Sequence, residues 1–209
     1  MREDEDKTIE YYDTNAEELA ERYENANVDV LHKKLLGTFN TGAMLIEIGC
    51  GSGRDAAFMI ARGYQVDCVE ASRSMVYFAL RLHPELHKRI IHGKWENISD
   101  ENILRSSKYD GVYSIAALMH MHAETIPRVL NRIYSILKPG GRFLFSVPLS
   151  RPFLSDSGLD SEGRYYLMLD HMQWHDLVIK AGFKKPEFFK SSDGLGRRDV
   201  TWLTCIAQI

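Results

Sequence analysis

The sequence predicts an α/β fold in which a doubly wound, mostly parallel sheet carries helices. The apolar run 44–48 has the composition of a buried strand, three glycines follow within residues 49–53, and helical spacing begins at Arg54. A second apolar run, 65–69, ends at Glu70, and strand and helix patterns then alternate along the chain. Strands joined through helices pair in parallel by a right-handed crossover. We therefore expect a ligand at the carboxyl ends of these strands.

The other elements follow from periodicity and from Gly and Pro punctuation. The sequence predicts one domain over 1–209, with residues 1–37 as an N-terminal helical cap region and residues 1–7 frayed. The predicted helices cover 8–23, 28–36 (ending at Gly37), 54–62, 74–83, 127–137 and 172–181. The further predicted strands are 89–93, one within 106–116, 142–147 after the stop Lys138-Pro139-Gly140-Gly141, one near Phe188, and 200–209, with a polar insertion at 148–163.

Composition restricts the partners and the compartment. The chain has 209 residues, is 44% hydrophobic and carries a formal net charge of −3, with Lys and Arg scattered along it, so we expect no nucleic-acid partner. A charged N-terminus and the lack of an apolar stretch near ~20 residues predict neither a signal peptide nor a membrane span. The three cysteines form no C-x-x-C motif, which favours buried free thiols in a reducing cytoplasm. Two His pairs at i,i+4 lack further ligands, so no metal is expected.

The glycine turn fits neither of two common phosphate-binding patterns. A dinucleotide fingerprint requires G-x-G-x-x-G, but Gly49, Gly51 and Gly53 are followed by no glycine at the third position. A P-loop requires a Lys after its last glycine, and none is present. Glu70 lies 21 residues beyond Gly49, at the end of the second strand, where a carboxylate can accept hydrogen bonds from both ribose hydroxyls of a nucleotide.

Three segments resemble the class I S-adenosylmethionine-dependent methyltransferase family. They are IEIGCGSGRD, VDCVEAS and LKPGGRFLFSVP, in the family's order and spacing. The resemblance implies a Rossmann-like sheet of seven strands, the last antiparallel, with helices on both faces. It also implies S-adenosylmethionine as cofactor, S-adenosylhomocysteine as product, and methyl transfer to an oxygen or nitrogen of a small-molecule acceptor. The alternatives are aminopropyl or carboxyl chemistry on the same cofactor, and a non-catalytic cofactor-binding or partner protein.

The same resemblance assigns cofactor contacts. Glu47, Gly49, Gly51 and Gly53 would surround the methionine part, Glu70 would hold the ribose, Ala71, Ser72 and Met75 would border the adenosine, and Ile115 and Ala116 would lie beside the methyl group. Arg54 would face the cofactor carboxylate or be exposed at the helix start. Lys94 occupies a position that is often acidic in relatives. Either Glu96 accepts from the adenine amino group, or backbone groups and Trp95 hold adenine.

The acceptor side is expected after the fourth strand and in two loops. His120 and His122 follow that strand, and His120 is predicted to be the base or orienting group, because histidine titrates near neutrality. Tyr12 in the N-terminal helix would also face the substrate. Arginines in the late loops, Arg151, Arg164 and Arg197, would bind an anionic substrate or pair with acids of the chain itself. The expected assembly is a monomer or a homodimer.

Overall fold

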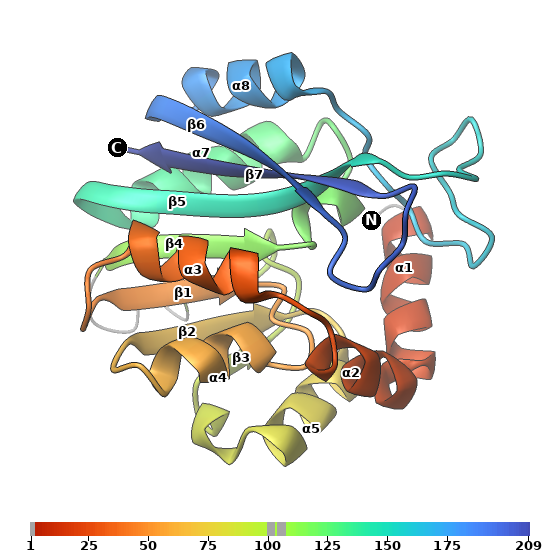
Figure 1. Cartoon of the computed structure of the whole chain (residues 1–209), viewed down its shortest axis with the longest axis horizontal. Coiled ribbons are helices and arrows are strands. Elements are labelled where there is room, and N and C mark those ends of the chain that lie inside the picture. Colours follow the sequence, from red (N-terminus) through yellow and green to blue (C-terminus); the bar gives the residue numbers. More distant parts are fainter. Residues whose placement is uncertain (1–2, 100–102, 104–107) are drawn as a thin grey trace.

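The computed structural model describes residues 3–99, 103 and 108–209 (Figure 1). The helices are α1 Glu3–Thr14, α2 Ala16–Glu24, α3 Asp29–Thr38, α4 Arg54–Ile60, α5 Arg73–Leu82, η1 Pro84–Leu86, η2 Leu118–His120, α7 Ile126–Ile136 and α8 His171–Lys180. The strands are β1 Met44–Ile48, β2 Gln65–Glu70, β3 Ile90–His92, β4 Tyr109–Ile115, β5 Leu137–Ser150, β6 Lys184–Ser192 and β7 Thr201–Gln208. The part of the predicted fourth strand at 106–107 lies outside the described residues.

The strands form one seven-stranded sheet in the order β3-β2-β1-β4-β5-β7-β6. Strands β1 to β5 are parallel, and β7 runs antiparallel to both β5 and β6. The order reverses at β1, where β2 lies on one side and β4 on the other, which is the position at which α/β sheets open a crevice for ligands. The predicted doubly wound fold with an antiparallel last strand is confirmed.

Helices cover both faces of the sheet, as the sequence predicts. One apolar cluster joins α3 and α4 to β1 and β2, with Leu35, Ala56 and Met59 fully buried. The other joins α7 and α8 to β4, β5 and β7, where Trp174 packs on Phe145 at a ring separation of 5.0 Å. Figure 1 shows α1 and α2 outside these layers, at one end of the sheet. Among the described residues, no helix combines the length and apolarity that crossing a membrane requires.

The N-terminal region differs from the prediction in two respects. The single helix expected over 8–23 is broken at Asn15 into α1 and α2, and the side-chain amide of Asn15 donates to the carbonyl of Tyr11. Residues 3–7, which were expected to fray, begin α1; residues 1–2 lie outside the described part. The cause is tertiary contact, because Asp6 pairs with Lys94 at 2.6 Å and the Thr8 hydroxyl accepts from the Tyr165 amide at 2.9 Å.

Two predicted boundaries were also wrong. Helix α3 passes through Gly37 and ends at Thr38, whose hydroxyl donates to the Lys34 carbonyl. Strand β5 begins at Leu137, through the glycine pair that was expected to be a loop, and it extends into the predicted insertion as far as Ser150. At its start, Leu137 pairs with Tyr109 of β4, and beyond the glycine pair β7 holds the strand in a ladder that runs from Arg142 opposite Gln208 to Ser150 opposite Thr201. The longer strand carries residue 151 toward the ligand edge of the sheet.

Candidate functional site

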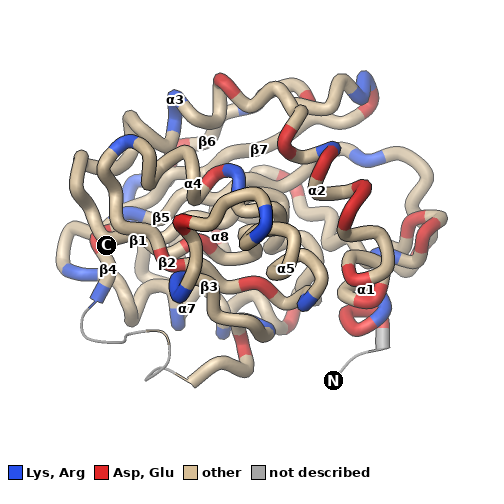
Figure 2. Tube along the Cα trace, turned by 90° about the horizontal axis from the view of Figure 1, so that it is seen from below, with Lys and Arg blue, Asp and Glu red and all other residues tan. Residues whose placement is uncertain are grey.

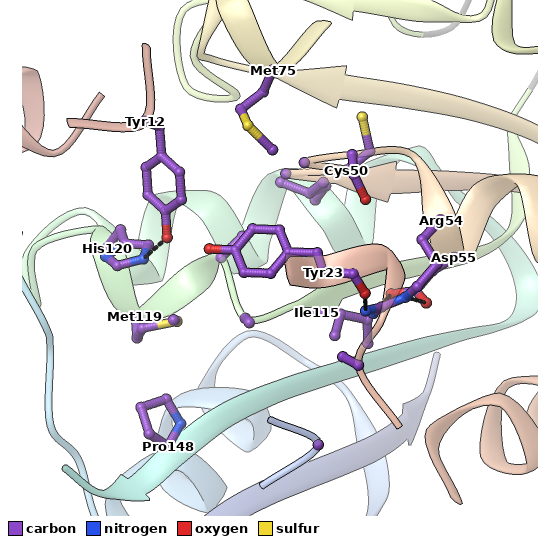
Figure 3. A pocket seen from close by; sticks show the side chains of 18 of the residues that line it. Tyr12, Tyr23, Cys50, Arg54, Asp55, Met75, Ile115, Met119, His120 and Pro148 are labelled. Atoms are coloured by element: carbon purple, nitrogen blue, oxygen red, sulfur yellow. Dashed lines mark hydrogen bonds and ion pairs between the residues drawn. The ribbon is translucent and has the colours of Figure 1, made fainter. Parts of the chain in front are cut away.

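A cavity of about 660 Å³ opens where β1, β2, β4 and β5 end, beneath α1 and α2 (Figure 3). Its volume falls within the range of small-molecule sites. The structure brings most of the predicted site residues to its wall: Tyr12, Glu47, Gly49, Gly51, Arg54, Glu70, Ala71, Ser72, Met75, Trp95, Glu96, Ile115, Ala116, His120, Arg151, Arg164 and Arg197. Gly53 and His122 do not line it. The figure shows the Tyr23 ring projecting across the cavity toward Tyr12 and His120.

The glycine turn brings backbone directly against the cavity. Gly49 has φ +74°, and a Cβ built on it would lie 2.4 Å from the Cβ of Ala117. Gly53 has a different role from the one expected, because its missing Cβ faces Leu86 at 2.4 Å, on the side of the turn where α4 packs on η1. The two glycines therefore serve close approach to β4 and helix packing respectively.

Gly49→Ala is expected to lower the free energy of unfolding by roughly 2–4 kcal/mol. Two costs add up: the strain of a non-glycine residue in the left-handed region, and the steric overlap of the new Cβ with Ala117. Gly63→Ala is the matched control: Gly63 has φ +88° but no atom within 4 Å of the added Cβ. It should lose only the backbone part, about 1–2 kcal/mol. Urea unfolding of both variants measures the difference, and equal losses would mean that contact with Ala117 does not matter.

Glu70, at the end of β2, fixes the turn and faces the cavity. Its Oε2 accepts from the Gly51 amide at 2.8 Å and its Oε1 from the Ser72 amide at 2.9 Å. Burial raises the pKa of Glu70, while the backbone N–H groups of Ser72 and Gly51 oppose that rise. Each carboxylate oxygen can accept more than one hydrogen bond. The side chain is therefore already oriented and still able to accept from two ligand hydroxyls.

Glu47 is the most deeply buried carboxyl group at the cavity. It is 1% exposed, and within the described part of the chain its Oε2 has no hydrogen-bond partner. Burial, followed by the nearby charge of Asp55, holds the pKa of Glu47 well above its usual range. A buried acceptor without a partner is costly, and such groups in native structures mark ligand or catalytic positions. This oxygen is suited to a cationic donor from a ligand.

Arg54 is neither exposed nor free. Its guanidinium donates to both carboxylate oxygens of Asp55 at 2.9 Å and to the Tyr23 carbonyl at 2.6 Å. Asp55 also contacts His32 Nε2 at 2.8 Å. Arg54 thereby ties the start of α4 to the end of α2 while still lining the cavity. His32 could not be predicted as a site residue, because an isolated histidine in an amphipathic helix is usually a packing or surface residue.

His120, in η2, forms a pair with Tyr12 from α1. Its Nδ1 lies 2.7 Å from the Tyr165 carbonyl, which can only accept, so Nδ1 carries the hydrogen and Nε2 accepts from the Tyr12 hydroxyl at 3.0 Å (Figure 3). Desolvation and the positive charges of Arg164 and Arg151 outweigh the Tyr165 bond and lower the pKa of His120 to about 4. The imidazole is therefore neutral at physiological pH.

His122 lies behind this pair. Its ring stacks on Tyr165 at 4.0 Å, and its backbone N–H donates to Glu5 at 3.3 Å. Because it does not line the cavity, the structure does not support its expected contact with substrate.

The region after β3 bears on how adenine would be held. Lys94 does not face a ligand alone, because it is paired with Asp6 of α1. Trp95 is 2% exposed and lies against the Arg132 guanidinium at 5.0 Å, while both Trp95 and Glu96 line the cavity. Either predicted way of holding adenine, by Glu96 as acceptor or by backbone groups and Trp95, therefore stays a prediction.

Helices α1 and α2 carry several acidic residues, drawn red in Figure 2, and two of these acids contact residues of the cavity wall. Asp13 accepts from the Ser72 hydroxyl at 2.6 Å and the Ser74 amide at 2.9 Å. Glu24 accepts from the Ser52 hydroxyl at 2.7 Å. These contacts join the cap to the turns after β1 and β2. Sequence reasoning missed them because acids on an amphipathic helix normally face solvent.

The late-loop arginines reach the cavity in pairs with acids. Arg151 and Arg164 both contact Asp160, at 2.9 and 2.7 Å. Arg197 contacts Asp193 at 2.6 Å, and Asp193 also accepts from the Trp202 indole at 2.8 Å. The predicted pairing with acids of the chain is therefore present, and because the arginines also line the cavity, their binding of an anionic substrate stays a prediction.

The fold and the site define a class of protein. The chain belongs to the methyltransferase-domain family, whose model matches residues 16–193. It is 27% identical over 134 residues to a malonyl-acyl-carrier-protein O-methyltransferase of Pectobacterium atrosepticum, covering 64% of this chain and 47% of that protein. It is 30% identical over 118 residues to phosphoethanolamine N-methyltransferase 2 of Caenorhabditis elegans, covering 54% of this chain and 26% of that one. These matches span about a quarter to a half of the length of the two relatives.

Solved structures show the same fold. The 1,6-didemethyltoxoflavin-N1-methyltransferase of Burkholderia thailandensis, solved with 1,6-didemethyltoxoflavin and S-adenosylhomocysteine, matches with a TM-score of 0.67 at 20% identity, over 88% of this chain and 78% of that one. Phosphoethanolamine N-methyltransferase 2 of Haemonchus contortus, solved with phosphomonomethylethanolamine and S-adenosylhomocysteine, matches with a TM-score of 0.67 at 22% identity, over 87% and 52% of the two chains.

Proposed function

We propose that this chain transfers a methyl group from S-adenosylmethionine to an oxygen or nitrogen of a small-molecule acceptor. Membership of the methyltransferase-domain family and the neighbours solved with S-adenosylhomocysteine support the donor. The observation that carries the proposal is that one cavity holds both a preoriented Glu70 and a buried oxygen of Glu47 that has no hydrogen-bond partner among the described residues. A nucleoside with an attached amino acid offers both of these groups a donor.

The residues present fit this cofactor. Glu70 would accept from the two ribose hydroxyls, and Glu47 would accept from the ammonium of the methionine part. Gly51 leaves room for backbone contact with a ligand, because it has φ +54° and the nearest atom to its missing Cβ is 3.7 Å away, on Met75. Trp95, Ala71 and Met75 supply apolar wall on the adenosine side.

When bound, the cofactor supplies a methyl group activated by a positively charged sulfur. The chain itself would then align the acceptor and exclude water. Helices α1 and α2 contribute to both, because their residues line the cavity. An acceptor that loses a proton as it attacks also needs a base. Tyr12 and His120 would provide it: the acceptor proton passes to the Tyr12 hydroxyl as that hydroxyl gives its own proton to His120 Nε2.

Glu47→Gln is expected to weaken S-adenosylhomocysteine binding by roughly 10- to 100-fold, the range that a hydrogen bond to a charged group supports. The glutamine keeps the shape of the side chain and removes its charge. Calorimetric titration measures the loss, with Glu187→Gln on the exposed edge strand β6 as the control. Unchanged affinity in Glu47→Gln would remove Glu47 from the cofactor site.

The same substitution should stabilise the ligand-free protein, and the sign follows from the raised pKa of Glu47. Because the pKa of Glu47 is higher in the folded state, its carboxyl group ionises at a lower pH in the unfolded chain. Wild-type stability is therefore lost as the pH rises from the pKa of the unfolded state through the pKa of the folded state. The gain in Tm for Glu47→Gln should be small at acidic pH and larger at alkaline pH. A Tm difference that did not change with pH would contradict this assignment.

The reaction itself is tested with a methyl-labelled donor and a set of metabolites. The proposal expects label in one class of small molecule, with formation of S-adenosylhomocysteine in equal amount. Loss of the aminopropyl or carboxyl part of the donor instead would show a different chemistry at the same cavity.

A further inference from the structure

We infer that the cavity end formed by Arg151 and Arg164 binds an anionic group of the acceptor, a carboxylate or a phosphate. This inference rests on the proposed function and names the substrate class for it. It is carried by the charge balance, the hydrogen bonding and the position of these two guanidinium groups.

One carboxylate faces two guanidinium groups. Asp160 accepts at Oδ1 from the amides of Glu162 and Arg164, at 3.0 Å each, and its Oδ2 lies within 2.9 Å of nitrogens of both Arg151 and Arg164. The arginine side chains are only 14% and 12% exposed. Among these three described side chains, two guanidinium charges therefore face one carboxylate charge in a poorly solvated place, an arrangement that an added anion would stabilise.

Arg151 also keeps an unused donor. Its Nε is buried and has no hydrogen-bond partner in the described part of the chain, although the same guanidinium donates from Nη2 to Asp160. The guanidinium carbon lies over the Tyr166 ring, 4.0 Å from its centroid. Guanidinium groups bind carboxylate and phosphate oxygens through neighbouring N–H groups in one plane. Arg151 is thus fixed in orientation and incomplete in hydrogen bonding.

Two further acids that line the cavity, Asp193 and Glu5, make their described contacts with groups other than Arg151 and Arg164. Asp193 is held by Arg197 and the Trp202 indole, and Glu5 accepts from the backbone N–H of His122. Neither contact involves Arg151 or Arg164. A ligand anion is therefore a suitable counterion for the arginine pair.

The arginine pair lies next to the proposed reacting group. The Tyr166 ring contacts both groups: its centroid is 4.8 Å from that of the His120 ring and 4.0 Å from the Arg151 guanidinium. An acceptor anchored there by its anionic group would place its nucleophile near Tyr12 and His120 after a short spacer. An anion would also offset the arginine charges that oppose protonation of His120, so the base would strengthen when the acceptor is bound.

The first test uses inorganic phosphate as the probe on protein saturated with S-adenosylhomocysteine. Phosphate, compared with chloride at equal ionic strength, is expected to raise Tm in the wild type. Arg151→Gln should weaken the apparent phosphate affinity at least tenfold and leave the Kd for S-adenosylhomocysteine unchanged. Arg151→Lys, which keeps the charge but not the planar fork, should show a smaller loss. Arg198→Gln, an exposed neighbour of the other arginine loop, is the control.

The second test compares methyl transfer to matched acceptors, each acid with its amide and each phosphate ester with its alcohol. The anionic members should be preferred, and Arg151→Gln should raise KM for them at least tenfold. Equal phosphate affinity in wild type and both Arg151 variants, or preference for the neutral members, would overturn the anion site. Failure to bind S-adenosylhomocysteine in the wild type would instead overturn the proposed function, so the two failures are distinguishable.

Discussion

Glu70→Ala is expected to weaken S-adenosylhomocysteine binding by about 100-fold or more. Two hydrogen bonds from ribose hydroxyls to a charged acceptor correspond to roughly 3–6 kcal/mol before relaxation, and each 1.4 kcal/mol is about tenfold. The substitution also leaves the amides of Gly51 and Ser72 without their acceptor, so the glycine turn loses its fixed shape. Calorimetric titration of the variant measures the effect.

Asp67→Ala is the matched control for Glu70→Ala. Asp67 is another buried carboxylate of β2, it accepts from the Tyr109 hydroxyl at 3.0 Å, and it does not line the cavity. It should cost stability and leave the affinity for S-adenosylhomocysteine unchanged. If Glu70→Ala and Asp67→Ala weakened the ligand equally, the effect would be one of general stability, and the ribose would be held elsewhere.

His120→Ala is expected to lower kcat by roughly 10²- to 10⁴-fold on an acceptor that must lose a proton, the range typical of a general base. The Kd for S-adenosylhomocysteine should not change, because His120 contacts Tyr12 and Tyr165 and not the Glu70 side of the cavity. Tyr12→Phe should reduce kcat less, since it removes the relay and leaves the imidazole. His87→Ala, at an exposed position, is the control. Full turnover in His120→Ala would exclude its proposed role.

The pH dependence adds a readout that a purely structural role would not give. Because the pKa of His120 is lowered to about 4, its neutral form persists through the physiological range. Turnover should therefore be independent of His120 ionisation at neutral pH and fall only as pH approaches that value. The stability linked to this histidine has the same direction: a lowered pKa means that stability is present above the unfolded pKa and lost as pH falls toward the folded one.

The fold could be predicted because local patterns and global topology agree. The glycine turn after β1, the acid that ends β2 and the alternating strands and helices each require the same parallel arrangement. The errors fall where long-range contacts override local signals. Strand β5 continues through Gly140 and Gly141 because β4 pairs with it on both sides of this glycine pair, at Leu137 and from Arg142 onward, where β7 pairs with it as well. Helix α1 begins at Glu3 because its acids Asp6 and Asp13 contact Lys94 and Ser72.

The side of the cavity that bears Glu47, Gly49 and Glu70 could be predicted from the sequence, and the side that bears Tyr12, His120 and the arginines could not. Glu47, Gly49 and Glu70 sit at strand ends, where the chain order alone brings them together. By contrast, the sharing of Asp160 by two arginines and the Tyr12–His120 contact join segments separated by up to 108 residues, through loops whose paths no periodicity determines. These residues could be identified as candidates from the sequence, but the contacts between them could not be predicted.

The most direct test of the central claim is calorimetry of the wild-type protein with S-adenosylhomocysteine, and with NAD in parallel. We predict saturable one-to-one binding of S-adenosylhomocysteine and no binding of NAD, because the cavity offers Glu47 and Glu70 to an aminoacyl nucleoside and the sequence has no dinucleotide fingerprint. No heat with S-adenosylhomocysteine or S-adenosylmethionine, or tighter binding of NAD, would contradict it.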